Sequence, residues 1–248
     1  MNSILNKKVD HRYNRNCPKF LEQYMMPSGV CDLILKNFND NSNKHQPGRL
    51  WSKELNDTEV TEYKKSTDLV IIPNDFTLTE KQKQEDLFLI ASDCHWKYLK
   101  HIEYMVEHYS KLYEHFGYLQ PLDCLESMNI QWYKPKEGYN YWHFERDNSS
   151  LVAASRVLVF MTYLNDVIDG GGTEFYYQDY SADARKGRTI IWPAEWMFTH
   201  RGITSPTENK YIITGWIHSP VPVPLSVHPV HTNERKTQPP LNLPNYHH

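Results

Sequence analysis

The sequence predicts a mostly β fold, a sandwich or barrel of short strands with helices in the N-terminal half. Seven short runs rich in β-branched and aromatic residues lie between Met128 and Ser219, and turn residues separate them. No helical pattern interrupts that region, whereas residues 87–116 carry apolar side chains at steps of three or four. With 40% apolar and 13% aromatic residues among 248, the chain can bury a sizeable core.

The N-terminal half is predicted to supply two helices and one strand. Residues 31–37, CDLILKN, are typical of a short helix, and residues 68–72, DLVII, of a β-strand that ends before a proline. A possible capping box, Thr79-x-x-Gln82, favours the start of a long helix that ends at Gly117. One face of that helix must pack against a large apolar surface.

The C-terminal half is predicted to hold the strands. They are expected in MNIQWYKP, YNYWHFE, RVLVFMTYLN, GTEFYY, RTIIWP, WMFTH and KYIITGWIH. A run of glycines, residues 170–172, is interpreted as a turn between strands that uses positive φ angles.

The predicted organisation is one domain between two polar or proline-rich ends. Residues 1–19 are polar and basic without periodicity, which predicts a flexible N-terminal segment. The domain covers residues 20–219, with helical support to about residue 120 and a β core over about 128–219. Residues 220–248 are proline-rich and predict an extended C-terminal arm.

Charge and composition exclude several classes of function. A net charge of −3 provides no basic field for phosphates, which disfavours nucleic acid as a partner. No apolar run approaches the roughly 20 residues that span a bilayer, and the N-terminus lacks a secretory signal. The four cysteines are scattered, which favours reduced thiols over a disulfide framework. A soluble, cytoplasmic protein without a membrane partner is expected.

A His-x-Glu pair and a distal histidine are the main candidate metal ligands. Side chains at i and i+2 of a strand point to one face, so His143 and Glu145 are predicted to project together. On that spacing alone a structural strand without a metal is favoured, because short motifs often match by chance. His200, in WMFTH, changes the balance, since two histidines and a carboxylate form the facial triad of non-haem Fe(II) enzymes. The same ligand types also suit catalytic zinc.

A lysine downstream separates these two interpretations. Lys210 opens the strand KYIITGWIH, and Thr214 and Trp216 share its face of that strand by alternation. A lysine that points inward is costly to bury unless it meets an anion, and a dicarboxylate cosubstrate would supply one. A lysine at a strand end that reaches solvent is the alternative.

The linear order of these residues resembles the Fe(II)/2-oxoglutarate-dependent dioxygenases of the prolyl-4-hydroxylase-like family. The resemblance covers roughly residues 31–218 and is strongest from residue 131 onward. The matching elements, in order, are Tyr133, Gly138, His143-Phe144-Glu145, Tyr163-Leu164-Asn165, Gly171-Gly172-Thr173-Glu174-Phe175, Lys186-Gly187, His200 and Lys210.

The resemblance implies a double-stranded β-helix, or jelly roll, with helices on the outside of one sheet. It implies that His143, Glu145 and His200 hold Fe(II), and that 2-oxoglutarate chelates the metal. Lys210 would pair with the distal carboxylate of 2-oxoglutarate, and Tyr163 would hydrogen-bond the same group. Tyr133 and Trp216 match positions that line the pocket.

The implied reaction is hydroxylation of an unactivated C–H bond, with consumption of O2 and release of succinate and CO2. A prolyl residue in a peptide is the best-known substrate of the family, but a fold does not fix a substrate, and small molecules stay open. The chain is also similar to short stand-alone oxygenases of bacteriophages, which would place it in a host cytoplasm. Two alternatives are a cupin-like metalloenzyme that uses Zn or Mn and a non-catalytic β-helix interaction module.

Two positions depart from the family pattern. Most prolyl hydroxylases carry Asp at the position of Glu145, and the extra methylene changes the reach of the carboxylate. The Tyr139-Asn140-Tyr141-Trp142 run before His143 is bulkier than the usual segment, and its tyrosines are candidates for the pocket mouth or for ordinary core packing.

Overall fold

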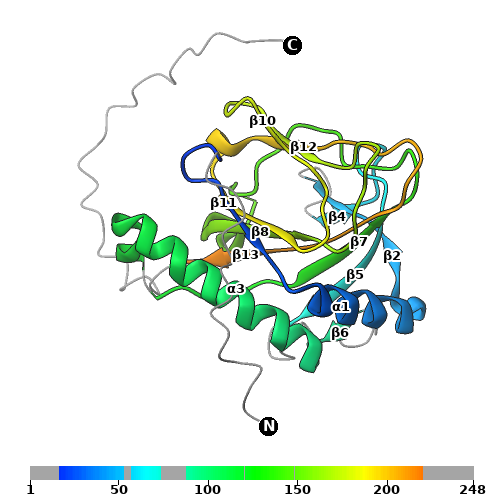
Figure 1. Ribbon diagram of the computed structural model, residues 1–248, viewed down its shortest axis with the longest axis horizontal. Helices are drawn as coiled ribbons and strands as arrows, with labels where there is room; N and C mark the ends of the chain where they lie inside the picture. The colour runs from blue at the N-terminus through cyan, green and yellow to red at the C-terminus, as the bar shows by residue number, and fades with distance from the viewer. Residues whose placement is uncertain (1–16, 53–56, 74–87, 120, 148, 220–248) are drawn as a thin grey trace, which may run out of the picture.

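The computed structural model describes residues 17–52, 57–73, 88–119, 121–147 and 149–219 (Figure 1). The predicted flexible N-terminal segment lies almost entirely outside these residues, and the proline-rich arm lies wholly outside them. Among the described residues, no helix is long and apolar enough to cross a membrane.

The strands form one large sheet and two small ones. The large sheet has the strand order β1-β11-β8-β13-β7-β5-β2, and β6 pairs with β5. A three-stranded sheet has the order β10-β9-β12, and β3 pairs with β4. The strands are β1 (Glu22–Met25), β2 (Gln46–Pro47), β3 (Leu50–Ser52), β4 (Asp57–Glu59), β5 (Thr67–Ile72), β6 (Phe88–Ile90), β7 (Met128–Tyr133), β8 (Arg156–Tyr163), β9 (Thr173–Phe175), β10 (Tyr180–Ala182), β11 (Arg188–Pro193), β12 (His200–Gly202) and β13 (Lys210–His218).

Two helices cover one face of the large sheet, and the three-stranded sheet lies on its opposite side (Figure 1). Most pairings in the two larger sheets are antiparallel, and the exception is the parallel pair β5–β6. The helical elements are α1 (Ser28–Asp40), η1 (Ser42–Lys44), α3 (Asp93–Leu112), η3 (Glu114–Leu119), α4 (Leu151–Ala154) and η4 (Trp196–Phe198). This is the predicted jelly roll with helices outside one sheet.

Strand β8 shows how alternation builds the two cores. Leu158 and Phe160 belong to the core beneath the helices, where Tyr98 of α3 is one of their partners. Val159 and Met161 belong to a second core between the two sheets. Because successive strand side chains point to opposite faces, one strand contributes to both cores. The site described below lies on the second side.

Most of the predicted strands are confirmed, but two of them, WMFTH and YNYWHFE, differ in the structure. WMFTH was predicted as a strand, yet Trp196–Phe198 is a 3₁₀ helix and His200 begins a strand rather than ending one. YNYWHFE forms no strand and makes only single bridges, including His143 with His200. Its backbone turns to several partners, with Glu145 N–H donating to Ala194 O, so no continuous ladder forms.

The long helix starts later than predicted. Residues 88–90 form β6, because their backbone pairs in parallel with β5 instead of continuing a helix. The helix begins after Ser92, whose side chain meets the His95 N–H while the His95 ring accepts from the Ser92 N–H at 3.1 Å. This reciprocal pair satisfies amides that the first turn leaves unbonded. The predicted capping box at Thr79 lies outside the described residues.

The glycine turn and the cysteines agree with the sequence interpretation. Gly170 and Gly171 adopt φ angles of 82° and 73°, which glycine reaches without a steric penalty. No disulfide joins the four cysteines, which all lie among the described residues.

Candidate metal centre and cosubstrate pocket

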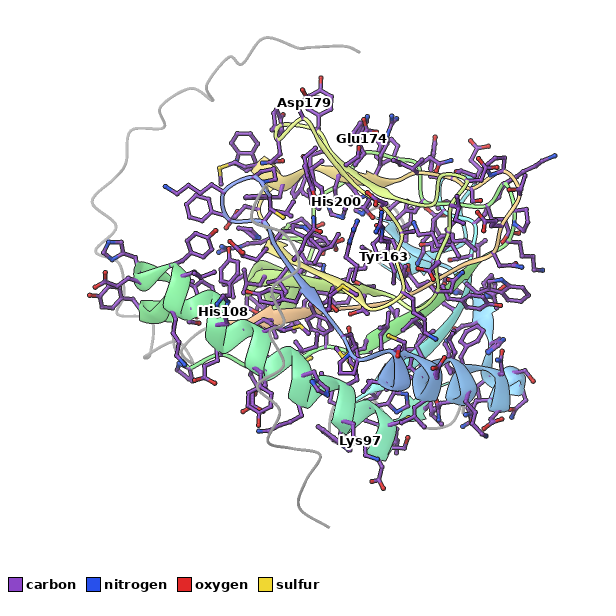
Figure 2. All side chains as sticks on the ribbon, in the orientation of Figure 1. Lys97, His108, Tyr163, Glu174, Asp179 and His200 are labelled. Carbon is purple, nitrogen blue, oxygen red and sulfur yellow. The ribbon has the colours of Figure 1, made fainter. Side chains whose placement is uncertain are left out.

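Two histidines far apart in the sequence meet through a backbone bridge. The His143 N–H donates to His200 O at 3.0 Å, and the His200 N–H donates to His143 O at 2.9 Å. This pairing brings the two imidazole centroids to 4.3 Å. Figure 2 shows His200 inside the molecule, between the three-stranded sheet and the large sheet. A single backbone bridge therefore brings the two histidines together, where the sequence predicts a strand around each of them.

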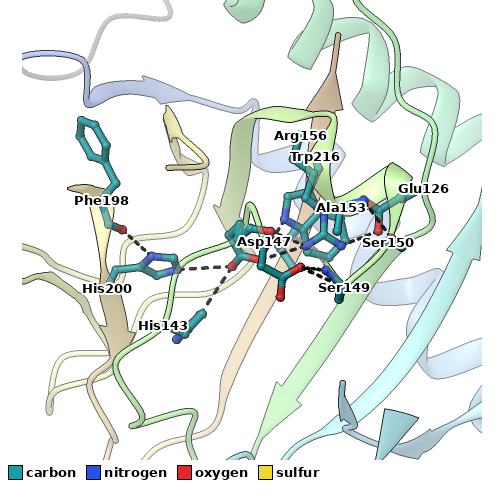
Figure 3. Close-up of polar contacts among 12 residues, drawn as sticks. Glu126, His143, Asp147, Ser149, Ser150, Ala153, Arg156, Phe198, His200 and Trp216 are labelled. Carbon is teal, nitrogen blue, oxygen red and sulfur yellow. Dashed lines mark hydrogen bonds and ion pairs between the residues drawn. The ribbon is translucent and has the colours of Figure 1, made fainter. Parts of the chain in front are cut away.

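Glu145 completes a cluster of three possible metal ligands. Its Oε1 lies 3.5 Å from Nε2 of His143 and 3.5 Å from Nε2 of His200 (Figure 3). One donor atom from each residue lies within 4.8 Å of the others. His200 is buried, and the side chains of His143 and Glu145 are 15% and 17% exposed, so the cluster is open on one side.

Backbone carbonyls orient both imidazoles. Nδ1 of His143 lies 2.8 Å from Tyr141 O, and Nδ1 of His200 lies 2.9 Å from Phe198 O. A ring nitrogen next to a carbonyl must carry the proton, which leaves Nε2 to face the carboxylate. The ring of Tyr139 stacks on His143 with centroids 3.9 Å apart. Each metal-facing nitrogen is thus fixed in direction by a contact on the other side of its ring.

The charge state of the cluster suits a cation. Burial lowers the pKa of His143, and the nearby His200 lowers it further, which favours the neutral imidazole that binds a metal. Burial acts to raise the pKa of Glu145, but the two adjacent imidazoles outweigh it and hold that pKa well below its ordinary value. Nitrogen lone pairs and a carboxylate oxygen therefore converge on one point. Two imidazoles and one carboxylate form the ligand set of the Fe(II) facial triad, so these residues fit the metal.

The cluster opens into a cavity of about 440 Å³, and Lys210 forms part of its wall. Lys210 is 7% exposed, and its Nζ makes one hydrogen bond, a long one of 3.4 Å to Gly172 O. Among the described residues, no carboxylate forms an ion pair with it. Burial lowers the pKa of Lys210 to about 7. A buried ammonium that faces a cavity favours the binding of an anion, because the anion supplies the opposite charge that burial has removed from its surroundings.

The other predicted pocket residues differ in how they reach the cavity. Tyr133 and Trp216 line it. Tyr163 does not line it, and its hydroxyl lies 2.7 Å from Thr173 Oγ1. Thr173 itself lines the cavity, so Thr173 lies between the Tyr163 hydroxyl and the cavity. Figure 2 shows Tyr163 in the interior between the sheets.

Sequence reasoning missed several residues around the cavity. Thr173 belongs to the family pattern, but the sequence analysis assigns it no role at the site. Lys64 lines the cavity and forms a buried ion pair with Asp68, with Nζ and Oδ2 2.8 Å apart. Arg156 and Glu126 also line it and pair with each other through two hydrogen bonds of 2.5 Å. Arg156 and Glu126 are 30 residues apart, so only the fold brings them together. Lys64 and Asp68 are four residues apart, but no local pattern places that pair at the cavity.

The geometry agrees with a comparison against protein families. Residues 128–218 match the model of the 2OG-Fe(II) oxygenase superfamily. The chain carries a 2OG-Fe(II) oxygenase domain. It is a 2-oxoglutarate-dependent dioxygenase, and the cofactors of this family are Fe(II), 2-oxoglutarate and O2. The matched range contains His143, Glu145, His200 and Lys210.

Solved structures of prolyl hydroxylases share the fold of this oxygenase domain. A viral collagen prolyl hydroxylase from Paramecium Bursaria Chlorella virus-1 has 15% identity and a TM-score of 0.56, with 82% of this chain and 97% of that chain covered. A Pseudomonas putida prolyl-4-hydroxylase has 15% identity and a TM-score of 0.56, with 80% and 92% covered. A Trichoplax adhaerens prolyl hydroxylase, in complex with a hypoxia inducible factor peptide fragment, has 14% identity and a TM-score of 0.57, with 81% and 84% covered. A search of curated proteins found no match.

Proposed function

We propose that His143, Glu145 and His200 hold Fe(II) and that 2-oxoglutarate lies between this metal and Lys210. The observation that carries the proposal is the buried Lys210 ammonium in the same cavity as the three ligands. A hydrolase or isomerase that uses the same ligand set needs no such cation. A dicarboxylate that chelates a metal with one end leaves its second carboxylate to pair with a lysine.

Three further residues are proposed to shape the cosubstrate end of the cavity. Tyr133 of β7 and Thr173 of β9 line it together with Lys210. Tyr133 pairs directly with Lys210 in the register of β7 and β13, and the Tyr133 hydroxyl donates to Gln131 Oε1 at 2.7 Å. Tyr163 orients the Thr173 hydroxyl, which then bonds the distal carboxylate. The role that the family resemblance implies for Tyr163 thus becomes an indirect one.

The proposed reaction converts a substrate C–H bond to an alcohol. One atom of O2 enters the substrate and the other enters succinate, as 2-oxoglutarate loses its carboxyl group as CO2. Fe(II) with bound 2-oxoglutarate supplies the activation of O2. The protein's own residues orient the ligands and hold the cosubstrate by charge, and the sheets keep bulk water from the reacting atoms.

A prolyl residue in a peptide is the proposed substrate. Structures that share the fold include a prolyl hydroxylase bound to a peptide fragment, and the reaction class is the same. The cavity extends past Glu145 to residues of loops and strands that carry many hydrogen-bonding groups, including Asn129, Ser149 and Ser150. Such a polar entrance suits a peptide backbone, whose carbonyl and amide groups need partners when they leave water.

An anaerobic titration tests the cofactor assignment. Metal-free protein receives Fe(II) and then 2-oxoglutarate, and a weak visible charge-transfer band is expected from the chelate. Admission of O2 should remove the band and produce succinate. If metal binds without the band, the cupin-like alternative with Zn or Mn gains support. If no metal binds, the non-catalytic module does.

A second experiment tests the substrate. Proline-containing peptides are incubated with Fe(II), 2-oxoglutarate and O2, and the products are analysed by mass spectrometry. A gain of one oxygen atom on proline, matched mole for mole by succinate, is the expected result. A peptide series in which alanine replaces each proline serves as the control. If succinate forms but no peptide is oxidised while free amino acids are, the substrate is a small molecule.

A further inference from the structure

The outer oxygen of the Glu145 carboxylate has its own hydrogen-bond partners. Oε1 faces the two histidines, whereas Oε2 accepts a hydrogen bond from the indole nitrogen of Trp216 at 3.0 Å. NH1 of Arg156 lies 3.7 Å from the same Oε2 and donates to the backbone oxygen of Glu145 at 2.7 Å. The two carboxylate oxygens therefore meet different surroundings, one facing the candidate metal position and one facing an indole and a guanidinium.

Arg156 is itself held in place on two sides. Its Nε and NH2 donate to the two carboxylate oxygens of Glu126 (Figure 3). Nε2 of His218 lies 2.8 Å from Glu126 Oε1. The Arg156 guanidinium carbon lies 4.1 Å from the ring centroid of Trp216. A two-bond arginine–carboxylate pair has a fixed geometry, and here it fixes the plane against which the indole packs.

We propose that Trp216 and Arg156, backed by Glu126, form a clamp that positions Glu145 as a single-oxygen metal ligand. This inference rests on the proposed metal site. The clamp engages Oε2, so that only Oε1 is available to the metal. The glutamate carboxylate bridges the two imidazoles and the indole, with Oε1 3.5 Å from each Nε2 and Oε2 3.0 Å from the indole nitrogen. Aspartate is one methylene shorter, so Glu145→Asp is expected to lose the contact with the indole.

A clamp of this kind acts on the metal through the carboxylate. Partners of metal ligands orient those ligands, and their removal lowers metal affinity by about 10- to 100-fold. Trp216 and Arg156 are thus positioning residues, and the lining role inferred from the sequence describes only part of what Trp216 does. Trp216→Phe tests the idea most directly, because it removes the N–H donor while keeping a ring for Arg156 to pack against.

The experiment measures Co(II) affinity by visible absorption and calorimetry in the full-length protein without 2-oxoglutarate. Four proteins form a cycle: the wild type, Trp216→Phe, Glu145→Asp and the double variant. Trp132→Phe is the matched control, because its indole nitrogen donates to Asn209 Oδ1 at 2.9 Å, and Trp132 is not among the residues that line the cavity. Trp216→Phe is expected to raise the Kd for Co(II) at least tenfold, and Trp132→Phe to leave it unchanged.

The cycle distinguishes the loss of a specific contact with Glu145 from a general disturbance of the metal site. If the indole acts through Glu145 Oε2, Trp216→Phe has little further effect in the Glu145→Asp background, where the contact is already lost. Equal losses in both backgrounds, or an unchanged Kd in Trp216→Phe, would overturn the clamp while the metal site stands. Absence of Co(II) binding by the wild type would overturn the metal site and the clamp together.

Discussion

Nζ of Lys210 lies 5.5 Å from the ring centroid of Tyr133, and 5.7 Å from that of Tyr163. The ammonium thus stands between two aromatic faces at the inner end of the cavity. Aromatic faces attract a cation but do not neutralise it. Under the proposed function, this ammonium pairs with the distal carboxylate of 2-oxoglutarate.

Replacement of Lys210 should weaken 2-oxoglutarate binding and spare the metal. Lys210→Met keeps an unbranched side chain that is one atom shorter and removes its charge. A hydrogen bond to a charged group contributes about 1.5–3 kcal/mol, which corresponds to a loss of about 10- to 100-fold in affinity. Calorimetry with 2-oxoglutarate and with Co(II) provides the two measurements. Lys100→Met, at an exposed helix position, is the control, and an equal loss of Co(II) affinity in Lys210→Met would contradict the assignment.

The affinity for 2-oxoglutarate should depend on pH through Lys210. Burial lowers the pKa of Lys210 to about 7, so this side chain becomes neutral above that pH in the free protein. The bound carboxylate favours the charged form and raises the lysine pKa, so binding takes up a proton above pH 7. The affinity should be flat below about pH 7 and fall by up to about tenfold per pH unit above it. Lys210→Met should remove this slope, and a slope that persists would assign the titration to another group.

Thr173 should matter more for 2-oxoglutarate than Tyr163. Thr173→Val removes the hydroxyl that lines the cavity, whereas Tyr163→Phe removes only the group that lies 2.7 Å behind it. A larger increase in the Kd for 2-oxoglutarate is therefore expected for Thr173→Val. Should Tyr163→Phe have the larger effect, the tyrosine would contact the cosubstrate directly, as the family resemblance implies.

Loss of His200 should abolish turnover through loss of the metal. His200→Ala removes one of three ligands, and the protein is expected to retain no stoichiometric Fe(II) and to form no succinate. Metal analysis after desalting and a succinate assay measure the two effects. His115→Ala, which changes a residue of the 3₁₀ helix η3, serves as the control. Normal consumption of 2-oxoglutarate by His200→Ala would refute the ligand assignment.

Gly215 should be required by the core beneath the helices. A Cβ at this position would lie 2.4 Å from Cζ of Phe160, which is fully buried. Overpacking of this kind costs about 1–3 kcal/mol, so Gly215→Ala should lower the free energy of unfolding by that amount in urea denaturation. Gly29→Ala, where a Cβ meets no atom within 4 Å, should not destabilise the protein. Phe160→Leu should reduce the penalty of Gly215→Ala, and additive effects would show that the ring is not the obstacle.

Periodicity in the sequence was sufficient for the central strands. β7, β8, β11 and β13 follow from alternation and β-branched residues, because each property is local to a few residues. The same alternation placed Lys210, Thr214 and Trp216 on one face, and all three line the cavity. The boundaries failed where a distant partner decides them. Residues 88–90 form a strand only because β5 is beside them, and their apolar side chains fit either a helix or a strand.

The sequence by itself determined the fold class, the candidate ligands and the buried lysine, because these depend on residue types and short spacings. Only the tertiary structure decided how they meet. His143 approaches His200 through one bridge instead of a strand, the Tyr163 hydroxyl turns to Thr173, and Trp216 reaches Glu145 across the cavity. Each contact joins residues that different strands or loops contribute. Their directions are set by the order and register of the sheets, which no local pattern contains.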